Sequence, residues 1–216
     1  MDEIKETGGA RIGMANATWP LATLTVNAAK LELNASIVGN LTFKPSDVTS
    51  ITPYVIIPFL GQGIQIHHTI AAYNAKVIFW TMGSPEALIA RIAQTGFLNN
   101  TSSTPGAHDA EIAMAQSGGG FPMKKPAAIT IVVIWNLLFF AAFAKFFTGI
   151  GLEFRINILI AVALVFLTAL LTLINEPFRK LVLKPGRTIN DVKTGLFFIM
   201  FITGMLFIGI SLMRFP

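Results

Sequence analysis

The sequence predicts a two-part membrane protein of the α+β class, with an N-terminal antiparallel β-sheet domain closed by one helix, followed by three transmembrane helices. Three apolar runs, 127–147, 156–174 and 194–213, each have about the 20 residues that a helix needs to cross a bilayer. Before them, apolar and polar residues alternate with period two, which is typical of half-buried strands. The hydrophobic content of 53% exceeds the usual range of about 45–50% for soluble domains.

The strands are predicted from this alternation and from the turn residues that interrupt it. Leu24 and Val26 alternate with polar neighbours, as do Leu31 and Leu33. The Trp19-Pro20 pair and several Gly and Asn residues separate the runs. The predicted strands are 11–18, 21–27, 29–35, 38–44, 47–58, 62–70 and 75–82.

One helix is predicted directly after the strands. Ser84 is a suitable N-cap, and Pro85 suits the first helical position. Leu88 and Ile92 contribute to one apolar stripe. Gly96 suits a left-handed C-terminal cap, which ends the helix.

A segment rich in Ser, Thr, Gly, Ala and Pro follows this helix. Such a composition is typical of a flexible linker, with residues 118–120 as a glycine hinge. The predicted organisation is a β domain over 1–98, a linker over 99–126 and three transmembrane helices within 127–216.

Charge predicts which side of the membrane each part occupies. If the N-terminal domain is inside, the cytoplasmic flanks hold seven Lys/Arg and the outer flanks hold three, namely Lys145, Arg155 and Arg214. This bias follows the positive-inside rule. The polar N-terminus also lacks the apolar core of a signal peptide. We therefore expect an integral protein of the cytoplasmic (inner or plasma) membrane, with a cytoplasmic N-terminal domain and the C-terminus outside.

The basic residues that flank the helices are the candidate contacts to anionic lipid, because each contributes about 1 kcal/mol near a negatively charged leaflet. They are Lys124, Lys125, Arg179, Lys180, Lys184, Arg187 and Lys193. Asn136, near the middle of the first apolar run, is the candidate for a polar contact between helices. The many aromatic residues of the runs are expected to face lipid or pack between helices, and a pigment or quinone pocket is the rarer alternative.

The residue inventory indicates no catalytic chemistry. The chain contains no cysteine, which excludes thiolate catalysis and Cys-based metal sites. His67 and His68 are neighbours on a predicted strand, so they point to opposite faces and are poorly placed to share a metal. We expect no enzyme activity, no catalytic residue, no metal and no cofactor. Because the basic charges flank apolar runs, the expected partners are the lipid bilayer and protein, not nucleic acid.

The order of strands and closing helix resembles the pleckstrin-homology superfamily, in particular its GRAM-like and bacterial PH-like domains. The resemblance covers about residues 10–98 and is carried by five segments: the opening NATWPLATLTV from Asn16, KLEL from Lys30, GIQIHH from Gly63, KVIFWT from Lys76, and the helix SPEALI from Ser84. It implies a strongly bent sheet that binds a lipid headgroup or a protein segment. The predicted first hairpin, 14–26, has no Lys or Arg, which departs from the phosphoinositide-binding pattern of the family.

Three functions remain open at this point. The first is a non-catalytic, membrane-anchored PH-like adaptor that docks a protein segment, or weakly a lipid, at the cytoplasmic membrane face. The second is an accessory subunit of a larger multi-protein membrane complex, with partner helices packed on the three spans. The third and weakest is a small transporter or membrane enzyme.

Overall fold

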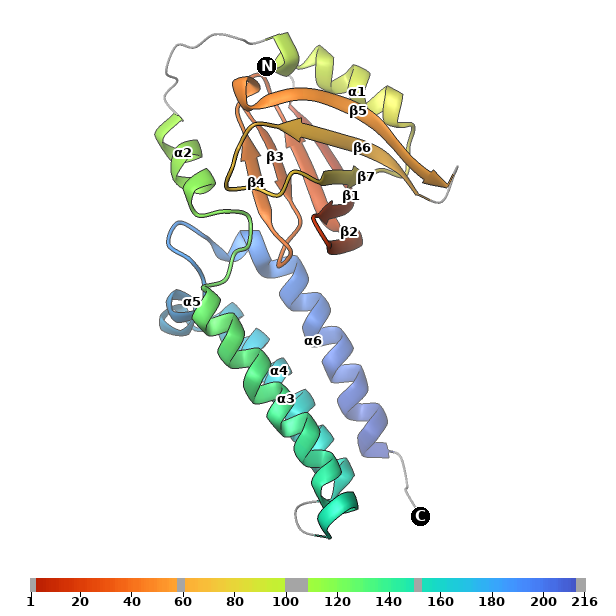
Figure 1. The fold of residues 1–216 in the computed structure, drawn as a ribbon, viewed down its shortest axis with the longest axis vertical. Helices are drawn as coiled ribbons and strands as arrows, with labels where there is room; N and C mark the ends of the chain where they lie inside the picture. The colour runs from red at the N-terminus through yellow and green to blue at the C-terminus, as the bar shows by residue number, and fades with distance from the viewer. Residues whose placement is uncertain (1–2, 58–60, 100–108, 150–152, 213–216) are drawn as a thin grey trace. The chain divides into compact units, whose positions relative to one another are not determined.

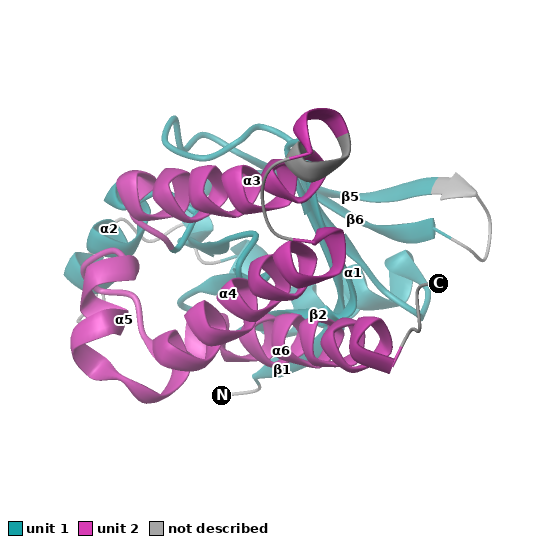
Figure 2. Ribbon diagram, turned by 90° about the horizontal axis from the view of Figure 1, so that it is seen from below, with its two compact units in different colours: residues 1–122 teal, residues 123–216 magenta. Residues whose placement is uncertain are grey.

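The structure is a computed structural model that describes residues 3–57, 61–99, 109–149 and 153–212 (Figure 1). The chain divides into two units, residues 1–122 and residues 123–216, which Figure 2 colours separately. Unit 1 holds the strands and two of the helices, and unit 2 consists of helices.

In the described part of unit 1, seven strands form one antiparallel sheet with the order β4-β3-β2-β1-β7-β6-β5. This order joins two meanders, β1 to β4 and β5 to β7, through the pairing of β1 with β7. The sheet is strongly curled (Figure 1). The strands are β1 (Ile4–Ile12), β2 (Ala15–Val26), β3 (Leu31–Asn34), β4 (Asn40–Phe43), β5 (Val48–Ile57), β6 (Gly61–His68) and β7 (Val77–Trp80), with a short 3-10 turn η1 (Pro45–Asp47) before β5. The predicted α+β class and strand number are confirmed.

The first two strands differ from their predicted bounds. β1 begins at Ile4, well before the predicted start at residue 11, because its sequence IKETGGARI has no regular alternation to mark it. The Trp19-Pro20 pair, predicted as a turn, lies inside β2 and has a cis peptide bond. The register shifts here, so that the β2 residues between Ala17 and Ala22 lie opposite the Gly8–Ala10 step of β1. An irregularity of this kind increases local twist, which favours the curl of the sheet.

The concave face of the sheet holds the core of unit 1. Alternating residues on each strand are fully buried there, as the period-two pattern predicts. They include Leu24, Val26, Leu31, Leu33, Leu41, Phe43, Ile64, Ile66, Val77 and Phe79. The helix α1 (Pro85–Gln94) packs against β5 and β6 and buries Leu88 and Ile92 in this core.

The ends of α1 follow the predicted capping. The Ser84 hydroxyl accepts a hydrogen bond from the Ala87 N–H at 3.2 Å, and Pro85 is the first helical residue. After the helix, Gly96 has a positive φ of 79°. The 3-10 turn η2 (Phe97–Asn99) then buries Phe97 in the core. The predicted caps are therefore confirmed.

Part of the segment predicted as a linker is helical and packs on the sheet. Helix α2 (Asp109–Ser117) contacts β4 and buries Ile112. The Gln116 side chain donates to the Thr42 carbonyl at 3.0 Å and to the Asp47 carboxylate at 2.7 Å. Beyond the helix, the Gly120 carbonyl accepts from the Asn40 N–H at 2.8 Å, so the edge strand β4 is partly covered.

Unit 2 contains three helices that are long and apolar enough to cross a membrane: α3 (Lys125–Thr148), α4 (Phe154–Ile174) and α6 (Ile189–Leu212). The predicted spans 127–147 and 156–174 lie within α3 and α4, and α6 covers the third span as far as Leu212, because residue 213 lies outside the described residues. Helix α4 packs against both α3 and α6, with small side chains such as Ala161 and Ala169 buried at the contacts. Within a bilayer, no hydrophobic driving force brings helices together. Small residues support their association because they allow the helices to approach closely.

The connection between α4 and α6 contains a short helix, α5 (Glu176–Val182). Asn175 caps it, because its side-chain oxygen accepts from the Phe178 N–H at 2.9 Å. Just after α5, Leu183 forms an antiparallel β-bridge with Met123, and the Lys124 N–H donates to the Val182 carbonyl at 2.8 Å. These two bonds bring the start of α3 to the α4–α6 connection.

Candidate functional site

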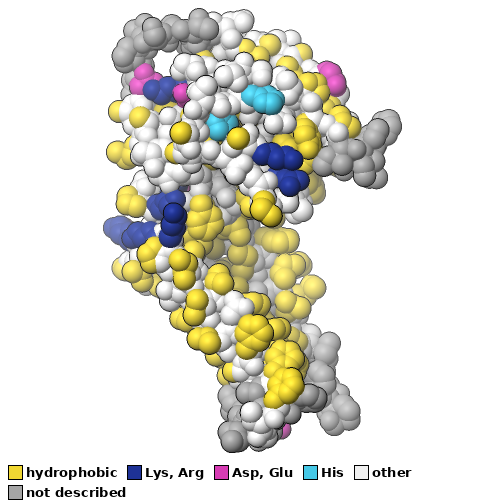
Figure 3. Space-filling view, viewed as in Figure 1, with side chains coloured by type: hydrophobic (Ala, Val, Ile, Leu, Met, Phe, Trp, Pro, Cys, Tyr) yellow, Lys and Arg dark blue, Asp and Glu magenta, His cyan; other side chains and the backbone are white. Residues whose placement is uncertain are grey.

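The structure gathers most of the predicted lipid-contacting residues at one end of unit 2. Lys124 and Lys125 precede or begin α3, while Arg179, Lys180, Lys184 and Arg187 lie in or after α5. The Met123–Leu183 bridge joins these two segments, and the Lys124 Nζ donates to the Lys180 carbonyl at 2.7 Å. Figure 3 shows the resulting group of Lys and Arg side chains. The remaining predicted residue, Lys193, is exposed on α6.

Arg179 and Lys180 contribute to the local fold. Arg179 donates to the Thr172 carbonyl at 3.0 Å and also to the Leu173 carbonyl, so it caps the C-terminal end of α4. Lys180 pairs with Glu176 one helical turn earlier at 2.7 Å, and this hydrogen bond lowers the pKa of Glu176. Both side chains therefore support the local fold as well as adding positive charge.

Lys125, Lys184 and Arg187 form the central part of this group. We call these three residues the basic cluster. The pKa of Lys184 is lowered, first by burial and then by the positive charges of Arg187 and Lys125. A cation held among other cations gains most from a neighbouring anion, because the opposite charge reverses the unfavourable interaction. The arrangement is chemically suited to a phosphate or another anionic group.

Asn136 lies in the middle of α3 and is partly exposed. Its amide donates to the Val132 carbonyl of its own helix at 2.7 Å. A contact of Asn136 with another helix stays a prediction. A different residue links α3 with α4: the buried Asn157 donates to the Ala141 carbonyl at 3.4 Å.

A second candidate site lies on the convex face of the sheet in unit 1. Phe79 of β7 points into the core, so its neighbours Ile78 and Trp80 point to the opposite face. On this face Trp80 lies opposite Gly9 of β1 on one side and opposite Gly63 of β6 on the other. Tyr54 of β5 follows in the same row, opposite Gly63.

The side chains of Tyr54 and Trp80 lie close together because the residue between them on β6 is glycine. The Tyr54 and Trp80 rings pack edge to face across Gly63, with centroids 5.6 Å apart. A methyl group on Gly9 would lie 3.2 Å from the Trp80 ring and 3.3 Å from the Trp19 backbone nitrogen. The β2 irregularity therefore brings the backbone of Trp19, whose side chain is 59% exposed, next to Gly9. We call Trp19, Trp80 and Tyr54 the aromatic row.

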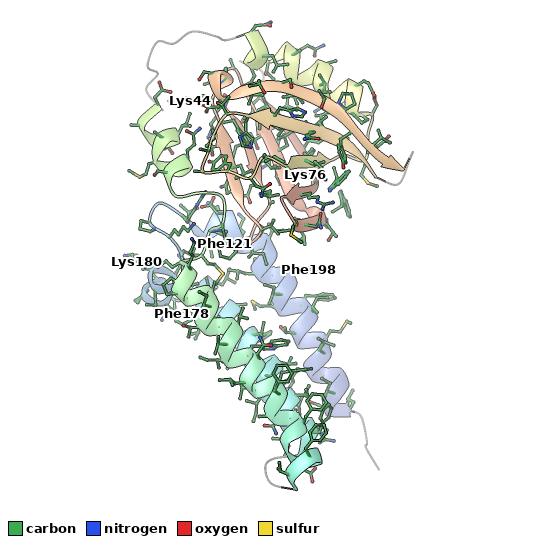
Figure 4. The ribbon with its side chains drawn as sticks, in the orientation of Figure 1. Lys44, Lys76, Phe121, Phe178, Lys180 and Phe198 are labelled. Carbon is green, nitrogen blue, oxygen red and sulfur yellow. The ribbon has the colours of Figure 1, made fainter. Side chains whose placement is uncertain are left out.

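Positive charge borders the aromatic row. Lys76 places its ammonium 5.6 Å from the centre of the Tyr54 ring, and Figure 4 shows Lys76 beside these strands. Arg11 lies opposite Ile78, one residue from Trp80 along β7. Among the described residues, the outward positions of β1, β5, β6 and β7 carry Lys5, Arg11 and His67 but no Asp or Glu.

Two of these basic residues, Lys5 and Arg11, belong to the first hairpin of the sheet. The hairpin was predicted over 14–26 without Lys or Arg, but the structure forms it from β1 and β2, with its turn at Gly13 and Met14. It therefore includes Lys5 and Arg11. The departure from the basic-hairpin pattern is smaller than the predicted strand bounds suggested.

The two adjacent histidines lie on opposite sides of β6. His67 contacts the Thr52 hydroxyl at 3.1 Å, and His68 contacts the Asn74 carbonyl at 3.0 Å while packing beside Phe43. Within the described residues, no group of three or more His, Cys, Asp or Glu is placed to hold a metal ion.

Comparison of the chain with protein-family models, with curated proteins and with solved structures finds no match. Sequence reasoning missed the aromatic row because its members come from strands that are far apart along the chain. The available signal was the pair Gly8 and Gly9 within a strand, since glycine in a strand often marks close approach of other groups.

Proposed function

We propose that this protein is a non-catalytic, membrane-anchored adaptor that docks a protein segment on the aromatic row of a PH-like domain. The aromatic row carries the proposal. Trp19 is exposed, and Trp80 and Tyr54 are partly exposed. Accessible aromatic side chains bordered by positive charge are typical of binding surfaces, where rigid rings supply contact area at low entropic cost. The strand order and the closing helix α1 support the PH-like assignment.

In this proposal the membrane helices and the basic cluster keep the docking domain at an anionic membrane surface. The seven-to-three distribution of Lys/Arg supports placing the sheet domain and α5 in the cytoplasm. Because the chain has no cysteine, single substitutions can report this sidedness. Met14→Cys should react with a membrane-impermeant maleimide only after cells are opened, whereas Pro216→Cys should react in intact cells. The reverse pattern would show that the orientation is wrong.

Co-purification of the full chain in mild detergent tests the adaptor function. We expect a partner protein, identified by mass spectrometry, at a fixed ratio to the chain. Trp19→Ala or Lys76→Glu should remove it. Met82→Ala removes another side chain that is 79% exposed but lies outside the aromatic row, and it should retain the partner.

A second function is favoured by one observation in unit 2. Asn136 has further hydrogen-bonding capacity in its amide at mid-helix, where lipid offers no partner. This favours an accessory subunit whose α3 contacts the helices of a larger complex. Under that function, Asn136→Leu would release the partner and Trp19→Ala would not. A partner that is insensitive to all of these substitutions would contradict both functions.

A further inference from the structure

The two edges of the sheet in unit 1 differ in how they are covered. At one edge, α2 contacts β4, and the Asn40 N–H donates to the Gly120 carbonyl. At the other edge β5 pairs with β6, and among the described residues no backbone bond joins the other side of β5 to another element (Figure 1). The β5 sequence VTSITPYVII has no charged residue of the kind that often protects an open edge.

The register of β5 shows which of its backbone groups face the open side. The Gln62 carbonyl of β6 accepts from the Thr81 N–H on the β7 side, so Gln62 turns its backbone groups away from its β5 partner Val55. The groups of Val55 therefore face outward, and so do those of Pro53 and Ile51 by alternation. Proline suits such a position, because its missing N–H removes no bond to β6.

These outward groups are accessible and define what can bind them. Thr52 and Pro53 are exposed and Val55 is 51% exposed, so this border of the sheet is open to solvent. A row of alternating N–H and carbonyl groups is matched by an extended peptide backbone, which pairs with an open edge as an additional strand. An α-helix uses the same groups internally. The chemistry of the edge therefore selects an extended segment.

The aromatic row borders this edge. Tyr54 lies beside Val55 on β5, and its ring centre is 5.6 Å from the Trp80 ring centre and 5.6 Å from the Lys76 ammonium. A strand added to β5 would place every second side chain on the convex face, about 5 Å from Tyr54. A β-branched or aromatic side chain at that position would pack on the Tyr54 ring.

We propose that an extended segment of a partner protein docks as an additional strand on the open edge of β5, with a β-branched or aromatic side chain beside Tyr54. This inference rests on the proposed adaptor function and specifies how the segment binds. The N–H groups of Ile51 and Val55 donate to the segment, and the outward carbonyl groups accept from it. One bond is missing at Pro53, which also disfavours unspecific pairing of the edge.

Peptide binding to the full chain in nanodiscs of neutral lipid tests the inference. The probe is the acetylated peptide DTVTVTVTD. The control DTPPTPPTD has the same end charges but lacks N–H groups on both sides of its backbone. Amide hydrogen exchange reports the contact, because the Ile51 and Val55 N–H groups face the open side. We expect the probe at saturation to slow exchange at both positions at least about tenfold, and the control peptide to leave it unchanged.

Variants of β5 separate strand pairing from other contacts. Val55→Pro removes an outward N–H without removing a bond to β6, and it should weaken probe binding about tenfold or more. Val55→Ala removes the same side chain but keeps the N–H, so its affinity should stay within about threefold of the unchanged chain. Pro53→Val supplies the missing N–H and should strengthen binding about threefold or more. Far-ultraviolet circular dichroism checks that each variant keeps its sheet.

The inference is overturned if the probe leaves exchange at Ile51 and Val55 unchanged, if both peptides bind equally, or if Val55→Pro and Val55→Ala bind alike. Slow exchange at these positions without peptide, lost when each nanodisc holds one chain, would assign the edge to a second copy. A co-purifying partner that depends on Trp19 but tolerates Val55→Pro would support the adaptor function and contradict strand pairing. Probe binding that follows the variants, without a Trp19-dependent partner, would support strand pairing and contradict docking on the aromatic row.

Discussion

Gly63 is the residue at which the sheet leaves least room for a side chain. A methyl group at this position would lie within 2.0 Å of the Phe79 carbonyl oxygen of the paired strand β7. Gly8 has a similar restriction, with the Trp80 carbonyl oxygen at 2.1 Å. Since backbone atoms of a central strand cannot move aside independently, both glycines are required for β7 to pair with its two neighbours.

We therefore predict that Gly63→Ala destabilises unit 1 by about 3 kcal/mol, at the upper end of the usual cost of overpacking. Denaturant unfolding of the full chain in detergent, followed by far-ultraviolet circular dichroism of the sheet, measures this loss. Gly83→Ala is the matched control, because the nearest atom to its new methyl group is the Thr81 hydroxyl at 3.7 Å. Equal stability of the two variants would show that β7 can shift to make room.

At the scale of single elements, helix α2 is held by three contacts of different kinds. Ile112 is buried, Gln116 bonds to Thr42 and Asp47, and Asp109 pairs with Lys44 at 2.9 Å. The ion pair is partly exposed and contributes little. Burial of Ile112 is the main apolar contact, so it should control whether the helix stays on β4.

Ile112→Ala should release α2 without unfolding the sheet. Deletion of a buried isoleucine side chain usually costs about 2–5 kcal/mol, and here the cost falls on a local contact. Hydrogen exchange of the α2 amides should accelerate tenfold or more, with amides of β1 and β7 unchanged. Met114→Ala, on the same helix but 68% exposed, is the control. If the strands exchange faster together with α2, the helix is part of the cooperative core.

The helices and strands differ in how well the sequence predicts their bounds. The caps of α1 and the three apolar spans were predicted, because each depends on residues that are close together in the chain. The bounds of β1 and β2 were predicted wrongly. Gly9 belongs to a strand that pairs with the distant β7, and Trp19-Pro20 lies inside β2 where its register with β1 shifts, and neither feature follows the alternation that marks a strand in the sequence. Of the sites, the basic residues were predicted individually, whereas the aromatic row depends on the β1–β7 and β6–β7 pairing, which sequence patterns do not specify.

For the whole molecule in its membrane, the basic cluster is the expected point of contact with anionic lipid. The pKa of Lys184 lies below its ordinary value because burial, Arg187 and Lys125 all disfavour the charged ammonium. In the pH window between this lowered pKa and the ordinary value, the folded chain binds fewer protons than the unfolded chain at this group. The contribution of Lys184 to stability therefore rises with pH through that window.

An anionic headgroup at the cluster should raise the pKa of Lys184 towards its ordinary value, because it favours the charged form. Nitrogen NMR titration of the lysine side chains, with the full chain in nanodiscs of neutral or anionic lipid, measures this change. Lys125→Ala should raise the same pKa in neutral lipid and reduce the effect of anionic lipid. An unchanged Lys184 pKa in anionic lipid would exclude a direct headgroup contact at this residue and limit the cluster to setting orientation.

The bonds at Gly120 and Met123 have a mechanical consequence for the proposed adaptor function. Gly120 is bonded to Asn40 within unit 1, and Met123 is bridged to Leu183 within unit 2, so only Phe121 and Pro122 lie between the two anchored points. Each residue adds at most about 3.5 Å of reach, and proline restricts the backbone further. Under the proposed function, the connection between the docking domain and the membrane helices is therefore short. A segment captured from a neighbouring membrane protein would experience a high effective concentration, which strengthens even a weak interaction, while distant soluble ligands gain no such advantage.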